Sequence, residues 1–305
     1  MKEINGAQGH LSALVTILVW GTTFIATTIL LSDFMPIEIL FYRFGIGLLV
    51  LMIVYPHRLK GTTKKEELMF AAAGLCVTLY FLLEIIALTH TAASNVGVII
   101  STAPFFTALL AYWLLYGEKP KLNFFIGFIT AIIGIFLISL SRSAVLEINP
   151  VGDILALLAA IVWAVYSILS RKISQFGHNT IQTTRRIFCY GLIILTPILF
   201  LSPFEWGLER FARPSNLFNI LFLGMGASAL CFVTWNLAVR KLGAVKTSVY
   251  IYLVPVITVV TSVIVLSERI TLMSAVGTIL ALSGLLISGR KIKITNAARN
   301  NVEQS

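Results

Sequence analysis

Ten apolar stretches, each long enough to cross a lipid bilayer as a helix, follow one another along this chain of 305 residues. A spanning helix needs about 20 apolar residues. The composition agrees, because 58% of the residues are hydrophobic and only 12% are charged, roughly half the charged fraction of soluble domains. We therefore expect an all-α membrane protein with ten transmembrane helices. The spans cover approximately residues 11–31, 36–55, 67–89, 92–116, 122–141, 151–170, 180–201, 217–238, 244–266 and 272–289.

Several classes of function lack their sequence signatures. Residues 1–10 are polar and no A-x-A site follows the first span, so no cleavable signal peptide is expected. Cys76, Cys189 and Cys231 lie inside apolar segments at spacings that match no metal site. The chain also has no H-E-x-x-H motif and no glycine-rich phosphate loop. We expect no enzyme activity, no metal and no cofactor, with a proton as the one candidate for coupling.

Basic residues are distributed unequally between the two sides of the spans. Of the 23 lysine and arginine residues, 15 fall on one side, 4 on the other and 4 within spans. Cytoplasmic loops carry an excess of Lys and Arg, so this pattern places both termini in the cytoplasm of a multi-pass protein of the cell (inner) membrane. The net charge of +10 then needs no nucleic acid as a partner, because the basic residues face the anionic lipids of the bilayer.

The two halves of the chain resemble each other. Trp20 and Arg43 are 23 residues apart in the first half, as are Trp163 and Arg186 in the second. Each half holds five spans, an odd number, so the second half enters the membrane from the opposite side. We expect two inverted repeats with a site near the membrane midplane at their interface, a design that permits alternating access. The predicted divisions are residues 1–143, 144–290 and a disordered cytoplasmic tail at 291–305.

Prolines and glycines repeat in the same order. The segment APFFTALLAYWLLYGEK (103–119) parallels VPVITVVTSVIVLSER (254–269), so Pro104 corresponds to Pro255. Both prolines interrupt helical hydrogen bonding and predict kinks, in helices that either rock or are bent permanently. Two glycines seven residues apart follow in each half and favour close helix packing. They are Gly127 and Gly134 in the first half, and Gly277 and Gly284 in the second.

This order of a proline-containing span, a Gly/Ser-Glu joint and a span with two glycines, present once in each half, resembles the drug/metabolite transporter superfamily. Nearly the whole chain matches the pattern of its ten-helix EamA-type transporters. The resemblance implies a central cavity and the movement of small metabolites, often amino acids or related compounds, commonly outward. It leaves open the substrate, the direction, and whether the protein is a monomer or a homodimer.

One carboxylate lies deep in the third span. Glu84 is about 8 Å from the outer end of its helix and Arg43 is about 10 Å from the same side, so an ion pair between them is available. Tyr80 lies one turn from Glu84 on the same face. The pair either fixes two helices or lines a cavity where it meets substrate or a proton. Glu38, at the outer interface, is accessible to solvent in this arrangement.

The other candidate substrate-binding residues are aromatic or polar groups within the spans. Trp20 and Trp163 lie near the middle of their spans, which favours a cavity over the interfacial belt. Arg186 corresponds to Arg43, although its side chain can also extend to the cytoplasmic interface. The remaining candidates are Asn95, Tyr166, Trp235, Asn236 and Tyr252.

We expect a secondary transporter, an exporter of small metabolites, that works by alternating access. The basic residues within the spans outnumber the acidic ones, which favours a carboxylate on the substrate, although arginine and lysine side chains that reach the interface weaken this inference. A membrane-embedded enzyme and a non-transporting protein or channel are the alternatives. An enzyme needs a reactive group of residues at one depth, and a channel needs a continuous polar pore; the sequence favours neither.

Overall fold

The computed structural model describes residues 2–90, 93–115, 120–142, 150–202, 204, 207, 209–266 and 271–289. Every regular element in these ranges is helical. The first half contains α1 (Lys2–Leu30), α2 (Pro36–Val54), α3 (Lys64–His90), α4 (Ala93–Ile100), α5 (Ala103–Leu114) and α6 (Leu122–Arg142). The second half contains α7 (Pro150–Ser174), α8 (Thr180–Leu201), η1 (Glu209–Ala212), α9 (Pro214–Leu221), η2 (Phe222–Leu230), α10 (Cys231–Leu242), α11 (Ala244–Ser248), η3 (Val249–Tyr252), α12 (Leu253–Leu266) and α13 (Leu272–Gly289). The predicted tail, 291–305, lies outside the described residues.

Within the described residues, seven helical segments are long and apolar enough to cross a membrane, and three shorter apolar helices accompany them. Two of the seven are composite, one made of α4 and α5 and the other of α9, η2 and α10. The shorter ones fall in α6, in α11 to α12 and in α13, where the sequence also predicts spans. Large apolar side chains on the outside of the bundle, such as Leu201 and Ile53, are 88% and 78% exposed, as expected for residues that face lipid.

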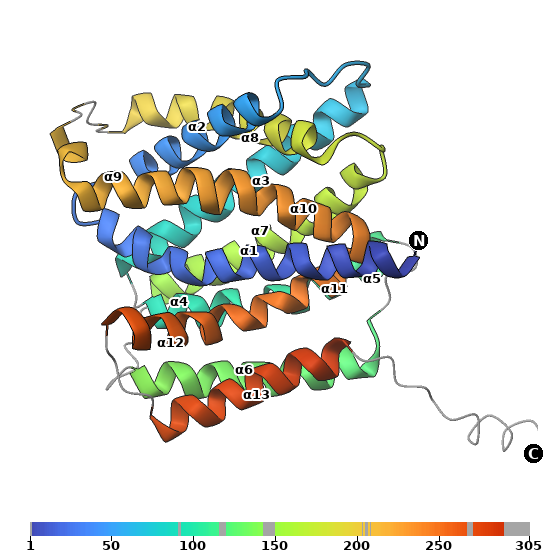
Figure 1. Cartoon of the computed structure of the whole chain (residues 1–305), viewed down its shortest axis with the longest axis vertical. Helices are drawn as coiled ribbons and strands as arrows, with labels where there is room; N and C mark the ends of the chain where they lie inside the picture. Colours follow the sequence, from blue (N-terminus) through green and yellow to red (C-terminus); the bar gives the residue numbers. More distant parts are fainter. Residues whose placement is uncertain are drawn as a thin grey trace, which may run out of the picture.

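The helices lie across the long axis of the molecule in successive pairs (Figure 1). At one edge α2 packs against α8, and at the opposite edge α6 packs against α13. The segments α1, α3, α7 and α10 form the middle, where the larger hydrophobic core lies. The chain enters α1 and leaves α13 at the same end of the bundle (Figure 1). The middle helices carry most of the candidate site residues.

The repeated glycines form the contact between α6 and α13. A Cβ atom added to Gly127 would lie 2.5 Å from the carbonyl oxygen of Gly284, and one added to Gly284 would lie 2.5 Å from that of Gly127. Gly134 and Gly277 meet in the same reciprocal way, also at 2.5 Å. The two helices therefore run antiparallel with their backbones in contact, which only glycine permits.

Two helical segments change their winding near the prolines. The first is interrupted between α4 and α5, at Ser101 and Thr102, directly before Pro104. The second passes from α11 into the tighter turns of η3 and continues as α12, whose third residue is Pro255. A proline lacks the backbone N–H that a continuous helix requires, so the interruption falls on its N-terminal side. Both interruptions lie beside the central cavity described below.

The N-terminal end of α2 is covered by another part of the chain and is shielded from solvent. Glu38 is fully buried, and its carboxylate accepts hydrogen bonds from Arg210 at 2.7 and 3.0 Å. It also accepts a bond from the backbone N–H of Met35 at 2.8 Å, which completes a capping box at the start of α2. The interpretation of Glu38 as accessible to solvent is wrong, because the segment that contains η1 brings an arginine over it.

Candidate functional site

A small cavity lies at the centre of the bundle, between helices of both halves. Its volume is about 50 Å³, enough for a few water molecules. Five of the predicted residues line it: Trp20, Arg43, Tyr80, Glu84 and Trp163. Helices α1, α2 and α3 supply four of them, and α7 supplies Trp163. The structure thus brings the two tryptophans predicted near mid-span together with Arg43, Glu84 and Tyr80.

Arg43 is held at the cavity by a residue of the other half. Its side chain is buried, and Nε donates a hydrogen bond of 2.8 Å to Oγ of Ser228 in η2. The guanidinium carbon lies 3.8 Å from the centroid of the Phe81 ring, a cation–π contact. These two contacts orient the guanidinium while its terminal nitrogens form no hydrogen bond with the described residues.

Ser228 occupies an unusual stretch of helix. Residues Phe222–Leu230 are wound as a π-helix, a form that is rare and that occurs frequently at functional sites. In the same stretch the carbonyl oxygen of Ala227 accepts a 3.0 Å hydrogen bond from Nε1 of Trp20. Two cavity residues of the first half are therefore anchored on η2. Nothing in the periodicity of this apolar segment indicates the wider turns.

Glu84 is the carboxylate of the cavity. Its side chain is buried, and Tyr80 lines the same cavity one helical turn away, as their spacing of four residues predicts. The second carboxylate oxygen, Oε2, has no partner among the described residues. Among these residues Glu84 also forms no ion pair with Arg43, although both line the cavity and their charges interact across it. Matched depth therefore brings the two groups together, but the arginine binds Ser228 instead.

Aromatic rings form one wall of the cavity. The ring centroids of Trp20 and Trp163 are 5.2 Å apart and nearly perpendicular, at 79°. The centroid of Tyr80 lies 4.8 Å from that of Trp163. Trp235 is fully buried behind this wall, 5.2 Å from Trp20. The wall combines flat apolar faces with the polar groups of Arg43 and Glu84, an arrangement suited to a small ligand that has both characters.

Tyr166 and Asn236 lie outside the cavity lining and satisfy each other. The Tyr166 hydroxyl donates to Oδ1 of Asn236 at 2.8 Å, and Ser170 donates to the same oxygen at 2.7 Å. Nδ2 of Asn236 donates to the Thr184 hydroxyl at 3.0 Å. This buried network joins α7, α8 and α10. Because its polar groups already have protein partners, we interpret it as a connection between helices.

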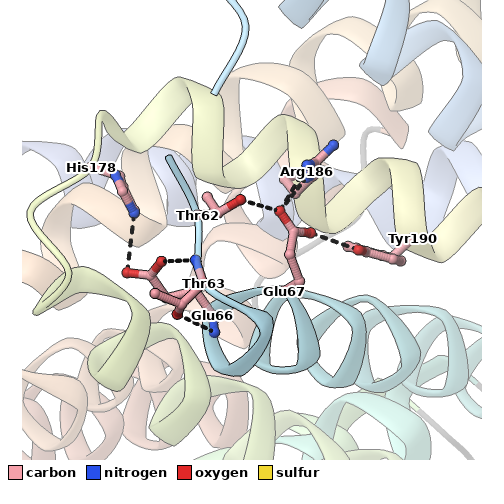
Figure 2. A network of polar contacts seen from close by, with 7 residues as sticks. All are labelled: Thr62, Thr63, Glu66, Glu67, His178, Arg186 and Tyr190. Carbon is pink, nitrogen blue, oxygen red and sulfur yellow. Dashed lines mark hydrogen bonds and ion pairs between the residues drawn. The ribbon is translucent and has the colours of Figure 1, made fainter. Parts of the chain in front are cut away.

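Arg186 belongs to a separate polar cluster at the start of α3 (Figure 2). Its Nε and Nη2 donate to Oε1 of Glu67 at 3.1 and 2.7 Å. The Tyr190 hydroxyl donates to the other oxygen of Glu67 at 2.6 Å, and Thr62 donates to Oε1 at 2.7 Å. Arg186 thus shares a repeat position with Arg43 but lies in a different environment, away from the central cavity.

Tyr252 does not line the cavity. Tyr252 is buried in the core beside α13, and its hydroxyl has no partner among the described residues. The side chain of Asn95 lies outside the part of the chain that the structure describes. Lining residues that sequence reasoning missed are Thr23, Phe24, Phe81, Gly97, Ile100, Ser101, Ile251 and Val254. Most are apolar and carry no sequence signal beyond their place in a span.

No group of three or more His, Cys, Asp or Glu side chains gathers as metal ligands in the described ranges. The central site instead presents one cation and one carboxylate in an apolar, aromatic environment. Such a site favours binding and release over covalent chemistry. Known proteins that resemble this chain belong to the same class of function.

The EamA-like transporter family model matches residues 7–140 and again residues 150–290. This chain belongs to the EamA-like transporter family. Two matches, one in each half, cover most of the chain. The protein is therefore a multi-pass membrane transporter, as the resemblance of the duplicated proline and glycine pattern implies.

Curated relatives that match this chain over nearly their whole length are named as transporters. An "uncharacterized transporter" of Archaeoglobus fulgidus is 28% identical over 292 residues, covering 93% of this chain and 98% of the relative. The "uncharacterized transporter YyaM" of Bacillus subtilis is 26% identical, covering 93% and 94%. A solved structure titled "Crystal structure of protein" superposes with a TM-score of 0.75 at 19% identity, covering 93% of this chain and 97% of its own. That likeness concerns the fold.

Proposed function

We propose that this protein is a secondary transporter of the cell membrane that exports a small metabolite, an amino acid or a related compound, by alternating access. The central cavity carries this proposal. It lies between the two halves of the chain and holds Arg43 and Glu84 in one buried space. Buried charged residues inside a membrane bundle are costly and mark substrate or ion pathways by default.

Paired packing contacts support two inverted five-helix repeats. α1 is the first helix of one half and α7 is the first helix of the other. The contacts of α1 with α10 and α12 have counterparts in the contacts of α7 with α3 and α5. The contact of α2 with η2 has a counterpart in that of α8 with α3, and α6 and α13 contact each other. Exchanging the halves thus reproduces the packing, as expected for ten spans related by a two-fold axis in the membrane plane.

The chemistry of the cavity favours a zwitterionic substrate. The free nitrogens of the Arg43 guanidinium suit a carboxylate, which arginine binds through parallel hydrogen bonds. The open oxygen of Glu84 suits an ammonium group, and the aromatic wall suits an apolar side chain. An α-amino acid carries all three features. With a proton as the coupling ion, Glu84 is the residue we propose to carry it.

The cavity has to widen before it can hold such a substrate. Pockets for drug-sized ligands measure about 300–1,000 Å³, and the cavity measures about 50 Å³. The interrupted segments α4–α5 and α11–α12 contribute lining residues on one side, among them Ser101 and Val254. Because their helical hydrogen bonding is already broken beside the cavity, we propose that these segments move most during alternating access.

A two-step experiment tests the function. A thermal-shift screen of the purified protein against amino acids, nucleosides and sugars identifies candidate substrates. Counterflow of each hit in proteoliposomes then separates a carrier from a channel. Only a carrier exchanges unlabelled substrate inside the vesicles for labelled substrate outside and so accumulates the label. Stabilisation by an amino acid, followed by counterflow, is the expected result. Flux without counterflow would favour a channel, and chemical conversion of the hit would favour an enzyme.

A further inference from the structure

A second recess lies between α2 and α8, at the end of the bundle that the distribution of basic residues assigns to the cytoplasm. Its volume is about 620 Å³, much larger than the central cavity. It is lined by the last turns of α2, the joint that follows it and the first half of α8. The lining residues are Leu48, Met52, Pro56, Arg58, Leu59, Gln182, Arg185, Arg186 and Cys189.

The polar end of this recess is strongly basic. Three arginines line it, and no acidic side chain does. Nε and Nη2 of Arg186 are already bound by Glu67 in the cluster of Figure 2. Arg58 is exposed, and the lining of the recess offers no carboxylate to Arg58 or Arg185. These two arginines therefore carry its uncompensated positive charge.

Backbone contacts hold Arg185 in place. Nη1 and Nη2 of Arg185 donate to the carbonyl oxygens of Tyr55 and His57 at 2.8 and 2.6 Å. Gln182 donates to the carbonyl oxygen of His57 at 3.1 Å. These bonds tie the joint after α2 to α8 and bring Arg58 to the mouth of the recess. A site organised before its ligand arrives loses less entropy on binding.

The recess continues into an apolar surface that faces lipid. On α8, Arg185, Cys189 and Ile193 follow one another at intervals of four residues and share a face. Ile193 is 58% exposed, and Met52 on the neighbouring helix is 48% exposed. A basic end near the cytoplasmic surface and an apolar strip toward the bilayer centre together match the two parts of a phospholipid.

We propose that this recess binds one anionic phospholipid of the cytoplasmic leaflet. Its phosphate lies between Arg58 and Arg185, and an acyl chain follows Met52, Cys189 and Ile193. Arginine suits phosphate because its planar guanidinium forms parallel charge-assisted hydrogen bonds. Basic pockets between transmembrane helices on the cytoplasmic side bind the headgroups of such lipids. The apolar strip distinguishes a lipid from a soluble phosphate compound, which would leave it uncovered.

Native mass spectrometry of the full-length protein in detergent tests the proposal. Titration with phosphatidylglycerol, phosphatidylcholine, inorganic phosphate or glycerol phosphate gives the affinity for each. We expect phosphatidylglycerol to bind most tightly. Arg58→Gln should weaken its binding about five-fold, since a basic residue at the membrane surface contributes about 1 kcal/mol. Lys60→Gln is the matched control, because Lys60 is exposed in the same joint and does not line the recess.

Arg58→Gln is the deciding variant. Arg185→Gln should weaken lipid binding further, but it also removes the bonds to Tyr55 and His57. Equal affinity for phosphatidylglycerol and phosphatidylcholine would overturn the proposal, as would an equal loss in Lys60→Gln and Arg58→Gln. Competition by inorganic phosphate or glycerol phosphate at the lipid's concentration would assign the recess to a soluble phosphate compound instead.

Discussion

Arg43 and Glu84 line one buried cavity from two neighbouring helices, yet the Arg43 side chain hydrogen-bonds Ser228 and not the carboxylate. Tyr80 lines the cavity one helical turn from this carboxylate. Removing one member of a direct ion pair would leave the other charge buried and unpaired, at a large cost in stability. Here Arg43 has a neutral partner in Ser228, and Oε2 of Glu84 has no partner among the described residues, so both groups stay available to a ligand. This separation leads to the first prediction.

Glu84→Gln should impair transport without unfolding the protein. The variant keeps the size and the contact with Tyr80 and loses the charge that we assign to the substrate or a proton. A hydrogen bond to a charged group contributes about 1.5–3 kcal/mol, so transport should fall at least about ten-fold. Counterflow across a range of pH measures both the loss and any change in pH dependence.

Glu66→Gln is the matched control for this prediction. It makes the same change on the same helix, in the first turn of α3, where Glu66 contacts His178 and Thr63 outside the cavity. Unchanged transport and an unchanged pH profile in Glu84→Gln would rule out its role in the cavity and leave it a structural group.

Gly134→Ala should destabilise the contact between α6 and α13. The new Cβ would lie 2.5 Å from the carbonyl oxygen of Gly277 and from the backbone nitrogen of Ala281, which cannot move independently. Overpacking of this kind costs about 1–3 kcal/mol. Thermal unfolding in detergent measures it, with Gly45→Ala as control, because no atom lies within 4 Å of a Cβ at Gly45. Equal melting temperatures for the two variants would contradict the close contact.

Glu67 and Arg186 should be energetically coupled. Their closest atoms are 2.7 Å apart, but their side chains are 23% and 39% exposed, so solvent screens the pair. A double-mutant cycle with Glu67→Gln and Arg186→Gln should give a coupling of about 0.5–1 kcal/mol in the free energy of unfolding. The cycle of Glu67 with Arg185 is the control. Arg185 binds backbone carbonyl groups, so its effect should add to that of Glu67 within about 0.5 kcal/mol.

Asp33 should make the stability of the folded protein depend on pH in the acidic range. Hydrogen bonds from Asn216 and Arg213 lower the pKa of Asp33 below its ordinary value of 3.8. The unfolded chain therefore binds this proton more readily, and the stabilisation is present above pH 3.8 and is lost as the pH falls below it.

Melting temperatures between about pH 6 and about pH 3 test this prediction. Arg213→Gln should lower the melting temperature at the upper end, and its difference from the wild type should shrink toward the lower end. Asp33→Asn should melt with less dependence on pH than the wild type in the same range. A difference for Arg213→Gln that stays constant with pH would mean that the ion pair is not its source.

Hydropathy predicted the helices, because the bilayer allows few alternatives to apolar helices, and the duplicated proline and glycine pattern predicted the two-part family match. Positions along the spans also placed Arg43 and Glu84 at a matching depth and Trp20 and Trp163 near the middle of their spans. These sequence patterns did not predict how each helix is rotated about its own axis, since helices enclosed by lipid and protein are apolar on all sides. For that reason Tyr166 and Asn236 were predicted to bind substrate, and the structure places them in a network behind the cavity.

Contacts between distant segments escaped prediction for a second reason. Ser228, which binds Arg43, lies in η2, whose wide helical turns no residue pattern indicates. Arg210 covers Glu38 because a joint folds back over α2. Both depend on tertiary structure, and the residues concerned are separated by much of the chain.

The reciprocal glycines of α6 and α13 also constrain how the gene can change. Gly127 and Gly284 each supply the space that the other occupies, and glycine is already the smallest residue. A larger residue at one position cannot be offset by a smaller one at its partner. Substitution at either glycine therefore has no compensating partner substitution, and the same holds for Gly134 and Gly277.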